Sequence, residues 1–256
     1  MSVESGFDGL QREVDADEDA VLEARRRRDV FRTALEGLEE MDEVIPSGSL
    51  ARGTHKDPIH DGGLLVVYTV DAHADWHPRD EDDETVGEAL EHTRQLIKDL
   101  IGNSGSDGEE VRHTLIRNHS VKCFLDDPDD PEAFTVDATP CLRRPEGGFW
   151  IPEKVTQKWV PTDPEYLMKV VAARHSEWPM FAKLVRVLKR WNSDNGGLMK
   201  SLLVELLALE HLDGNDRPRA LSQFFTATAA SVQEPLFDPA GLCGEVQPDL
   251  DRDAVE

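Results

Sequence analysis

The chain has 256 residues, 39% of them hydrophobic, which is enough for one large domain or two closely packed lobes. Its 52 acidic and 28 basic residues give a net charge of −24, and an acidic surface repels polyanions, so we expect no duplex nucleic acid as partner. No apolar run is long enough to span a bilayer and no lipidation signal is present, which predicts a cytoplasmic protein with no membrane partner.

Helical periodicity predicts a first helix over residues 17–41, within an acidic segment. A polar loop is then expected over 71–85, an amphipathic helix over 86–101 and a long irregular segment over 140–164. The expected strands cover residues 64–70, 111–116, 120–125 and 133–138. The continuous apolar run of the first of these strands predicts burial on both of its faces.

The C-terminal half predicts helices separated by Pro, Gly and Asn breakers, followed by an extended tail over 233–256. The expected helices cover residues 164–174, 180–191, 198–212 and 220–232. The fold class is therefore predicted as α+β, a mixed sheet with flanking helices plus a C-terminal helical lobe. The expected domains are an acidic N-terminal segment with a helix (1–43), a catalytic core (44–160) and the helical lobe with its tail (161–256).

The charge is unevenly distributed along the chain. Residues 1–50 hold fourteen acidic residues against six arginines, whereas residues 141–200 hold eleven basic residues against six acidic ones. A basic island in an acidic protein suits a small polyanionic ligand such as a nucleotide, and a solvated helix face is the alternative interpretation.

One segment joins a Gly48-Ser49 turn, Thr54 and an Asp61-Gly62-Gly63 sequence that opens an apolar strand. A turn with backbone N–H groups and a hydroxyl can hold a triphosphate, and an aspartate at the start of a strand can hold its divalent ion. This spacing resembles the nucleotidyltransferase superfamily related to DNA polymerase beta, in which the last position of the segment is a second aspartate. Gly63 occupies that position here.

Nucleotidyl transfer typically uses two divalent ions about 3.5–4 Å apart, held by three carboxylates. Two of these carboxylates lie two residues apart on one strand, because alternation places positions i and i+2 on the same face. Asp61 is the candidate for the first and Asp137 for the third, while Gly63 cannot coordinate a metal. A turn former at Asp61 and an ordinary strand end at Asp137 are the alternatives for each residue taken alone.

Further blocks occur in order downstream. They are Ser120-Val-Lys-Cys-Phe, Thr135-Val-Asp-Ala-Thr-Pro140, Gly147-Gly-Phe-Trp-Ile-Pro152, Trp159-Val-Pro-Thr-Asp-Pro164, Leu184-Val-Arg-Val-Leu-Lys-Arg-Trp-Asn192 and Lys200-Ser-Leu-Leu-Val-Glu-Leu-Leu207. Together they resemble the bacterial CD-NTase family of cyclic-oligonucleotide synthases, which act in anti-phage signalling. Oligoadenylate synthase and cyclic GMP-AMP synthase of animals are relatives.

The resemblance implies a nucleotidyltransferase in which Asp61 and Asp137 are catalytic and bind Mg²⁺ or Mn²⁺. It also implies binding of ATP or GTP, and effector or regulatory proteins as further partners. The nucleotide-binding residues that it implies are Gly48, Ser49, Lys189 and Ser201. Members of the family usually end with another helix, so the resemblance allows that this chain is truncated.

Two hypotheses follow from Gly63. The chain is an enzyme that makes a cyclic or linear oligonucleotide second messenger, or it is a degenerate nucleotide-binding module or partner protein with the same fold. A weaker third interpretation, transfer to tRNA or a protein hydroxyl, is disfavoured for tRNA by the acidic surface.

His73 and His77 are four residues apart with Asp75 between them, a spacing that allows a metal site. The polar surroundings of this segment favour surface histidines instead. We therefore expect no metal at this loop.

Overall fold

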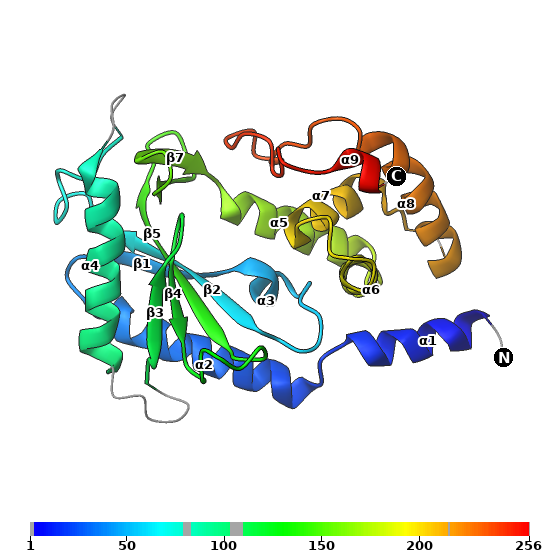
Figure 1. Cartoon of the computed structure of the whole chain (residues 1–256), viewed down its shortest axis with the longest axis horizontal. Coiled ribbons are helices and arrows are strands. Elements are labelled where there is room, and N and C mark those ends of the chain that lie inside the picture. The colour runs from blue at the N-terminus through cyan, green and yellow to red at the C-terminus, as the bar shows by residue number, and fades with distance from the viewer. Residues whose placement is uncertain (1–2, 79–82, 103–109, 215, 256) are drawn as a thin grey trace. The chain divides into compact units, whose positions relative to one another are not determined.

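The computed structural model describes residues 3–78, 83–102, 110–214 and 216–255. The elements follow in the order α1 (Val3–Val14), α2 (Glu18–Glu36), β1 (Met41–Ser47), α3 (Gly48–Arg52), β2 (Asp61–Tyr68), α4 (Glu84–Ile101), β3 (His113–Ile116), β4 (Val121–Phe124), β5 (Thr135–Arg143), β6 (Phe149–Glu153), β7 (Lys158–Thr162), α5 (Pro164–Glu177), α6 (Phe181–Asp194), α7 (Ser201–His211), α8 (Arg217–Ser231) and α9 (Arg252–Val255) (Figure 1). Within these described ranges, no helix combines the length and apolar character needed to cross a membrane.

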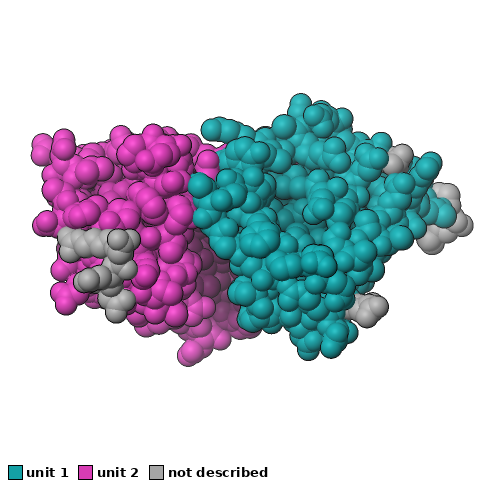
Figure 2. Space-filling view, turned by 90° about the horizontal axis from the view of Figure 1, so that it is seen from above, with its two compact units in different colours: residues 1–16, 52–57, 166–256 teal, residues 17–51, 58–165 magenta. Residues whose placement is uncertain are grey.

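The chain forms two compact units, which Figure 2 colours separately. The sheet unit comprises residues 17–51 and 58–165, and the helical unit comprises residues 1–16, 52–57 and 166–256. This grouping differs from the boundaries expected at 43/44 and 160/161, because α1 and the segment after α3 pack with the C-terminal helices.

The sheet unit is built on strands in the order β1-β2-β5-β4-β3, with β6 paired to β5 and β7 paired to β6. Strands β2 and β5 run parallel, while β1 lies antiparallel to β2 and β4 lies antiparallel to β5. A mixed sheet with flanking helices confirms the α+β class predicted from the sequence.

Helices α2 and α4 contact each other and pack against the sheet. The strand residues that face these two helices are buried with them. Leu64 and Val66 of β2, with Val136 and Ala138 of β5, join Phe31 of α2 in one hydrophobic core. Because side chains alternate along a strand, the residues between them point away from this core.

The helical unit has its own core, formed mainly by α6, α7 and α8. Leu184 and Leu188 of α6 pack with Leu203 and Leu207 of α7 and with Phe224 of α8. The predicted helices of the C-terminal half are therefore confirmed, with boundaries shifted by a few residues.

Two expectations about regular structure were wrong. Residues 140–164 hold the second half of β5 and the β6–β7 hairpin, where an irregular segment was expected. The expected strands did not include β1, which contains Pro46 and follows the end of the first predicted helix. β1 lies at the edge of the sheet, and an edge strand tolerates a proline because one row of its N–H groups has no partner strand.

Candidate functional site

The candidate carboxylates lie on neighbouring parallel strands of the sheet unit. Asp61 opens β2 and faces Thr135, while Gly63 faces Asp137 on β5. A strand spacing of about 4.8 Å and an offset of two residues place the Cα atoms of Asp61 and Asp137 about 8 Å apart. Both side chains point away from the core under α2 and α4, so the two carboxylates can reach one bound ion.

Asp137 is half-buried, and its surroundings work against its charge. Burial is the largest cause that raises its pKa, and the nearby charge of Asp61 raises it further. Lys122 and Arg117 act in the opposite direction. Lys122 is the register partner of Asp137 across β4 and β5, so its ammonium lies on the same face of the sheet.

Gly48 and Ser49, expected as a turn, are the first residues of α3 and lie beside the same position. β1 ends at Ser47, which pairs with Gly63, and α3 begins directly afterwards. Gly48 has φ of +77°, a conformation that favours glycine, and a Cβ added there would lie 3.6 Å from the backbone N of Gly63. The turn therefore brings Gly48 and Ser49 close to the point where β2 passes between Ser47 and Asp137.

Gly63 is the centre of this arrangement, and its surroundings leave little space for a side chain. Its φ lies outside the left-handed region, so its backbone suits an aspartate. A Cβ at this position would nevertheless lie 2.8 Å from Oγ of Ser47 and 3.1 Å from its carbonyl carbon and oxygen. An aspartate at position 63 would therefore require Ser47 to move, although the strand dihedrals suit it.

The donor set at Asp61 and Asp137 suits one hard divalent cation. Mg²⁺ is commonly held by one or two carboxylates together with substrate phosphates and water. The carboxylate that would bridge a second ion is absent at position 63. Within the residues described, three metal-binding side chains come together only at Glu40, His73 and His92, which lie elsewhere in the sheet unit.

The remaining predicted phosphate ligands belong to the helical unit. Ser201 is exposed at the first position of α7, where its hydroxyl is accessible. Lys189 on α6 is 3% exposed, and its Nζ lies 2.7 Å from Oε2 of Glu205 on α7. The roles of Lys189 and Ser201 in phosphate binding, and their convergence with Asp61, stay predictions.

Glu205 is a buried anion held by two cations, a feature that the sequence did not suggest. Arg52 and Lys189 both form ion pairs with its carboxylate, and Thr54 donates its hydroxyl at 2.9 Å. Burial alone would raise the pKa of Glu205, but the charges of Lys189 and Arg52 outweigh burial and lower that pKa to about 2. Arg52, the last residue of α3, belongs to the helical unit together with Thr54, Lys189 and Glu205.

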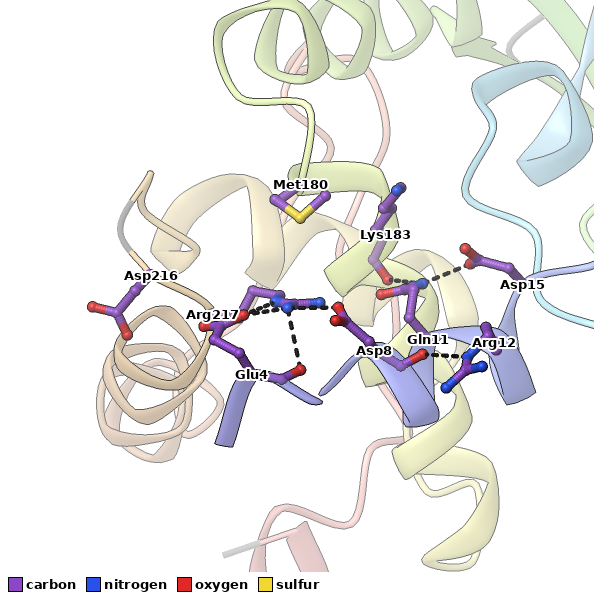
Figure 3. A pocket seen from close by; sticks show the side chains of 9 residues that line it. All are labelled: Glu4, Asp8, Gln11, Arg12, Asp15, Met180, Lys183, Asp216 and Arg217. Atoms are coloured by element: carbon purple, nitrogen blue, oxygen red, sulfur yellow. Dashed lines mark hydrogen bonds and ion pairs between the residues drawn. The ribbon is translucent and has the colours of Figure 1, made fainter. Parts of the chain in front are cut away.

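A pocket of about 760 Å³ in the helical unit contains none of the predicted site residues (Figure 3). Arg217 of α8 crosses it to form ion pairs with Glu4 and Asp8 of α1. Gln11 donates to the backbone carbonyl of Lys183, which ties α1 to α6 as well. The pocket is therefore lined by polar contacts of α1 with α6 and α8, which we call the polar seam.

Residues 1–174 match the profile of the Second Messenger Oligonucleotide or Dinucleotide Synthetase domain. No curated protein sequence matches the chain.

Several solved structures share the fold. CdnC of E. coli MS115-1, in a complex with HORMA-deltaN, is 18% identical with a TM-score of 0.69, and the match covers 98% of this chain and 84% of that one. CdnG of Bradyrhizobium diazoefficiens in complex with GTP is 12% identical with a TM-score of 0.72, over 97% and 87% of the two chains. The CdnE cyclic dinucleotide synthase of Elizabethkingia meningoseptica, solved with GTP and Apcpp, is 14% identical with a TM-score of 0.67, over 100% and 95%.

The substitution Asp137→Asn tests the electrostatic cost of the carboxylate pair. The raised pKa of Asp137 means that folding disfavours its charged form. The unaltered chain is therefore destabilised at pH values above the folded pKa of Asp137, and not at pH values below its unfolded pKa. We expect Asp137→Asn to raise the Tm by about 2–4 °C at pH 7 without metal, and to have little effect near pH 3. Millimolar Mn²⁺ should raise the Tm of the unaltered chain and leave that of the variant unchanged.

Asp127→Asn is the matched control, since Asp127 is an exposed aspartate of the same unit. A lower Tm for Asp137→Asn at pH 7, or an equal response of both chains to Mn²⁺, would contradict the assignment.

A second prediction concerns Glu205. Because folding lowers the pKa of its carboxyl group, Glu205 stabilises the fold at any pH above its unfolded pKa of about 4.5. This contribution is lost as the pH falls through the folded pKa of about 2. Glu205→Gln leaves two buried cations without their anion, so we expect a loss of about 3 kcal/mol in the free energy of unfolding at pH 7. Urea denaturation from pH 7 to pH 2 should show this difference narrowing below pH 4.5. Glu210→Gln, at an exposed position of the same helix, should change the free energy of unfolding little. Equal effects of the two substitutions would contradict the stabilising role of Glu205 between Arg52 and Lys189.

Proposed function

Because the chain belongs to the family of second messenger oligonucleotide or dinucleotide synthetase domains, we propose that it binds a nucleoside triphosphate with Mg²⁺ or Mn²⁺ for nucleotidyl transfer. The product would be a cyclic or linear oligonucleotide that serves as a second messenger in anti-phage signalling. The single observation that supports this site is the Asp61–Asp137 pair on parallel strands beside the Gly48-Ser49 turn.

In the transfer step, a ribose hydroxyl oxygen of one nucleotide attacks the α-phosphorus of another, the bond to the leaving pyrophosphate breaks, and the hydroxyl proton is released to water. The divalent cation would neutralise charge on the phosphate oxygens. Asp61 and Asp137 would hold that cation, while the amides of Gly48 and Ser49 and the Ser49 hydroxyl would donate to the triphosphate. Lys122, which faces Asp137 across the strands, adds a positive charge on the same face.

Gly63 limits this chemistry to one well-held ion. Position 63 lacks the carboxylate that would help to hold a second ion. The charge that a second ion would neutralise on the attacking or leaving oxygen is therefore left to water. Loss of one preorganised electrostatic group of this kind costs on the order of a hundredfold or more in rate. We therefore infer that the chain, as it stands, binds nucleotide and transfers it slowly.

The second candidate is a binding module or partner protein that has lost catalysis altogether. The short distances from Ser47 to a Cβ at position 63 favour this candidate, because a side chain there would require Ser47 to shift. CdnC, one of the proteins of similar fold, is solved in complex with HORMA-deltaN. We propose effector or regulatory proteins as partners of this chain in either case.

Nucleotide binding should not depend on an acidic residue at position 63. Calorimetry with ATP or GTP and Mg²⁺ should detect binding that weakens as salt rises, because charged phosphates are the main contacts. Ser49→Ala removes one hydrogen bond to a charged oxygen and should weaken binding about tenfold.

Ser222→Ala, at an exposed position of α8, is the control and should leave affinity unchanged. The absence of any binding at millimolar nucleotide would remove the proposal, in both its enzymatic and its binding form.

Restoring the carboxylate should restore the rate. We expect Gly63→Asp combined with Ser47→Ala to raise product formation from the four nucleoside triphosphates with Mg²⁺ at least about a hundredfold. Ser47→Ala removes the hydroxyl that a Cβ would meet at 2.8 Å, although the backbone contact at 3.1 Å still requires a small shift. Gly63→Asp alone should gain less, and should lower the Tm.

Gly63→Asn combined with Ser47→Ala is the matched control, since it adds the same volume without a carboxylate. Equal rates for the Asp and Asn variants would show that charge at position 63 does not limit catalysis. Inactivity of every variant, with nucleotide binding intact, would favour the binding module.

A further inference from the structure

Glu40, His73 and His92 form a cluster at the opposite end of the sheet unit from Asp61. Glu40 lies in the turn between α2 and β1, His73 in the loop after β2, and His92 on α4. Oε2 of Glu40 lies 2.8 Å from Nε2 of His73 and 2.8 Å from Nε2 of His92. The sequence predicted surface histidines at His73 and His77 and no metal at this loop, whereas the structure exposes His77 and places His73 in this cluster.

We propose that Glu40, His73 and His92 bind one Zn²⁺ ion. Two imidazole nitrogens and one carboxylate oxygen form a known zinc ligand set, with water as the fourth ligand. All three ligand atoms lie within 4.8 Å of one another. A tetrahedral ion with bonds of about 2.0–2.2 Å needs ligand atoms about 3.3 Å apart, so the two short contacts must open by about half an ångström.

The surroundings of the cluster hold the imidazoles in place. The His73 ring stacks on buried Trp76 with centroids 3.8 Å apart, and it meets Tyr68 edge-on at 4.9 Å. The Tyr68 hydroxyl bonds Oγ1 of Thr93 at 2.8 Å, which fixes the turn of α4 that carries His92. Aromatic packing of this kind limits the rotamers of a ligand before the metal arrives.

The cluster is also accessible to an incoming ion. The side chains of His73, Glu40 and His92 are 14%, 25% and 39% exposed, so one side of the cluster faces solvent. On binding, each ring would direct the lone pair of Nε2 to the ion and carry its proton on Nδ1.

This site is separate from the proposed catalytic site in place and in chemistry. β2 starts at Asp61 and ends at Tyr68, which contacts the cluster, so about 23 Å of strand separates the two sites. Imidazole nitrogen selects zinc and its neighbours in the first transition row, whereas the Asp61–Asp137 pair suits Mg²⁺. A bound ion would join three segments that are distant in sequence, and its water would leave one position open to solvent.

The test uses the full chain, treated with a chelator and dialysed, then titrated with Zn²⁺ and with Co²⁺. We expect one Zn²⁺ per chain at micromolar concentration, a higher Tm with Zn²⁺, and the visible absorption bands of tetrahedral Co²⁺. His92→Ala removes the most exposed ligand from a helix that tolerates alanine, and should weaken Zn²⁺ binding at least about a hundredfold.

His77→Ala is the matched control, since His77 belongs to the same loop and lies outside the cluster. Asp61→Asn is a second control: Zn²⁺ binding that is unchanged in this variant would show that the ion does not bind at the Asp61–Asp137 pair. X-ray absorption of the zinc-loaded unaltered chain should show two imidazoles and an oxygen, which tests the ligand set even where a variant fails to fold. Zn²⁺ retained by His92→Ala, or no Zn²⁺ bound at micromolar concentration, would leave the cluster as a hydrogen-bonded group and overturn the proposal.

Discussion

The parallel pairing of β2 with β5 is the constraint on which the candidate site depends. Its register places Gly63 beside Asp137, and the antiparallel β1 places Ser47 on the other side of the same glycine. Helices α2 and α4 pack against the sheet, so the intervening residues face away from that core. Burial of one face therefore determines which three positions could hold metal ligands, and one of the three lacks a side chain.

Much of this arrangement could be predicted from the sequence because its signals are local. The spacing from Gly48 to Asp61 spans a single turn and one strand start, and strand alternation relates Asp61 to position 63. The α+β class and the C-terminal helices follow from hydrophobic periodicity. Asp137 became a candidate through the ordered sequence blocks, since a single Val-Asp-Ala segment carries little information, and its role stays a prediction.

The contacts that could not be predicted join residues far apart in the chain. Glu205 meets Arg52 across about 150 residues, and no local pattern marks a glutamate that will be buried between two cations. Lys122 could have been found, because it alternates with buried Val121 and Cys123, but its partner on β5 depends on the strand order. The edge strand β1 was missed, and its place at the edge depends on a strand order that no local pattern gives.

The polar seam of the helical unit has a consequence for the start of the chain. Val14 and Gln11 are the buried residues of α1, while Arg217 holds Glu4 and Asp8 through ion pairs. Attraction between partly exposed charges weakens as salt is added, because the Debye length falls from about 8 Å at physiological ionic strength to about 3 Å at 1 M, whereas apolar burial is not screened. The attachment of this first helix therefore weakens as salt rises, while the association of α6 with α7, built on leucine packing, does not. Ionic strength thus acts on the N-terminal helix more than on the rest of its unit.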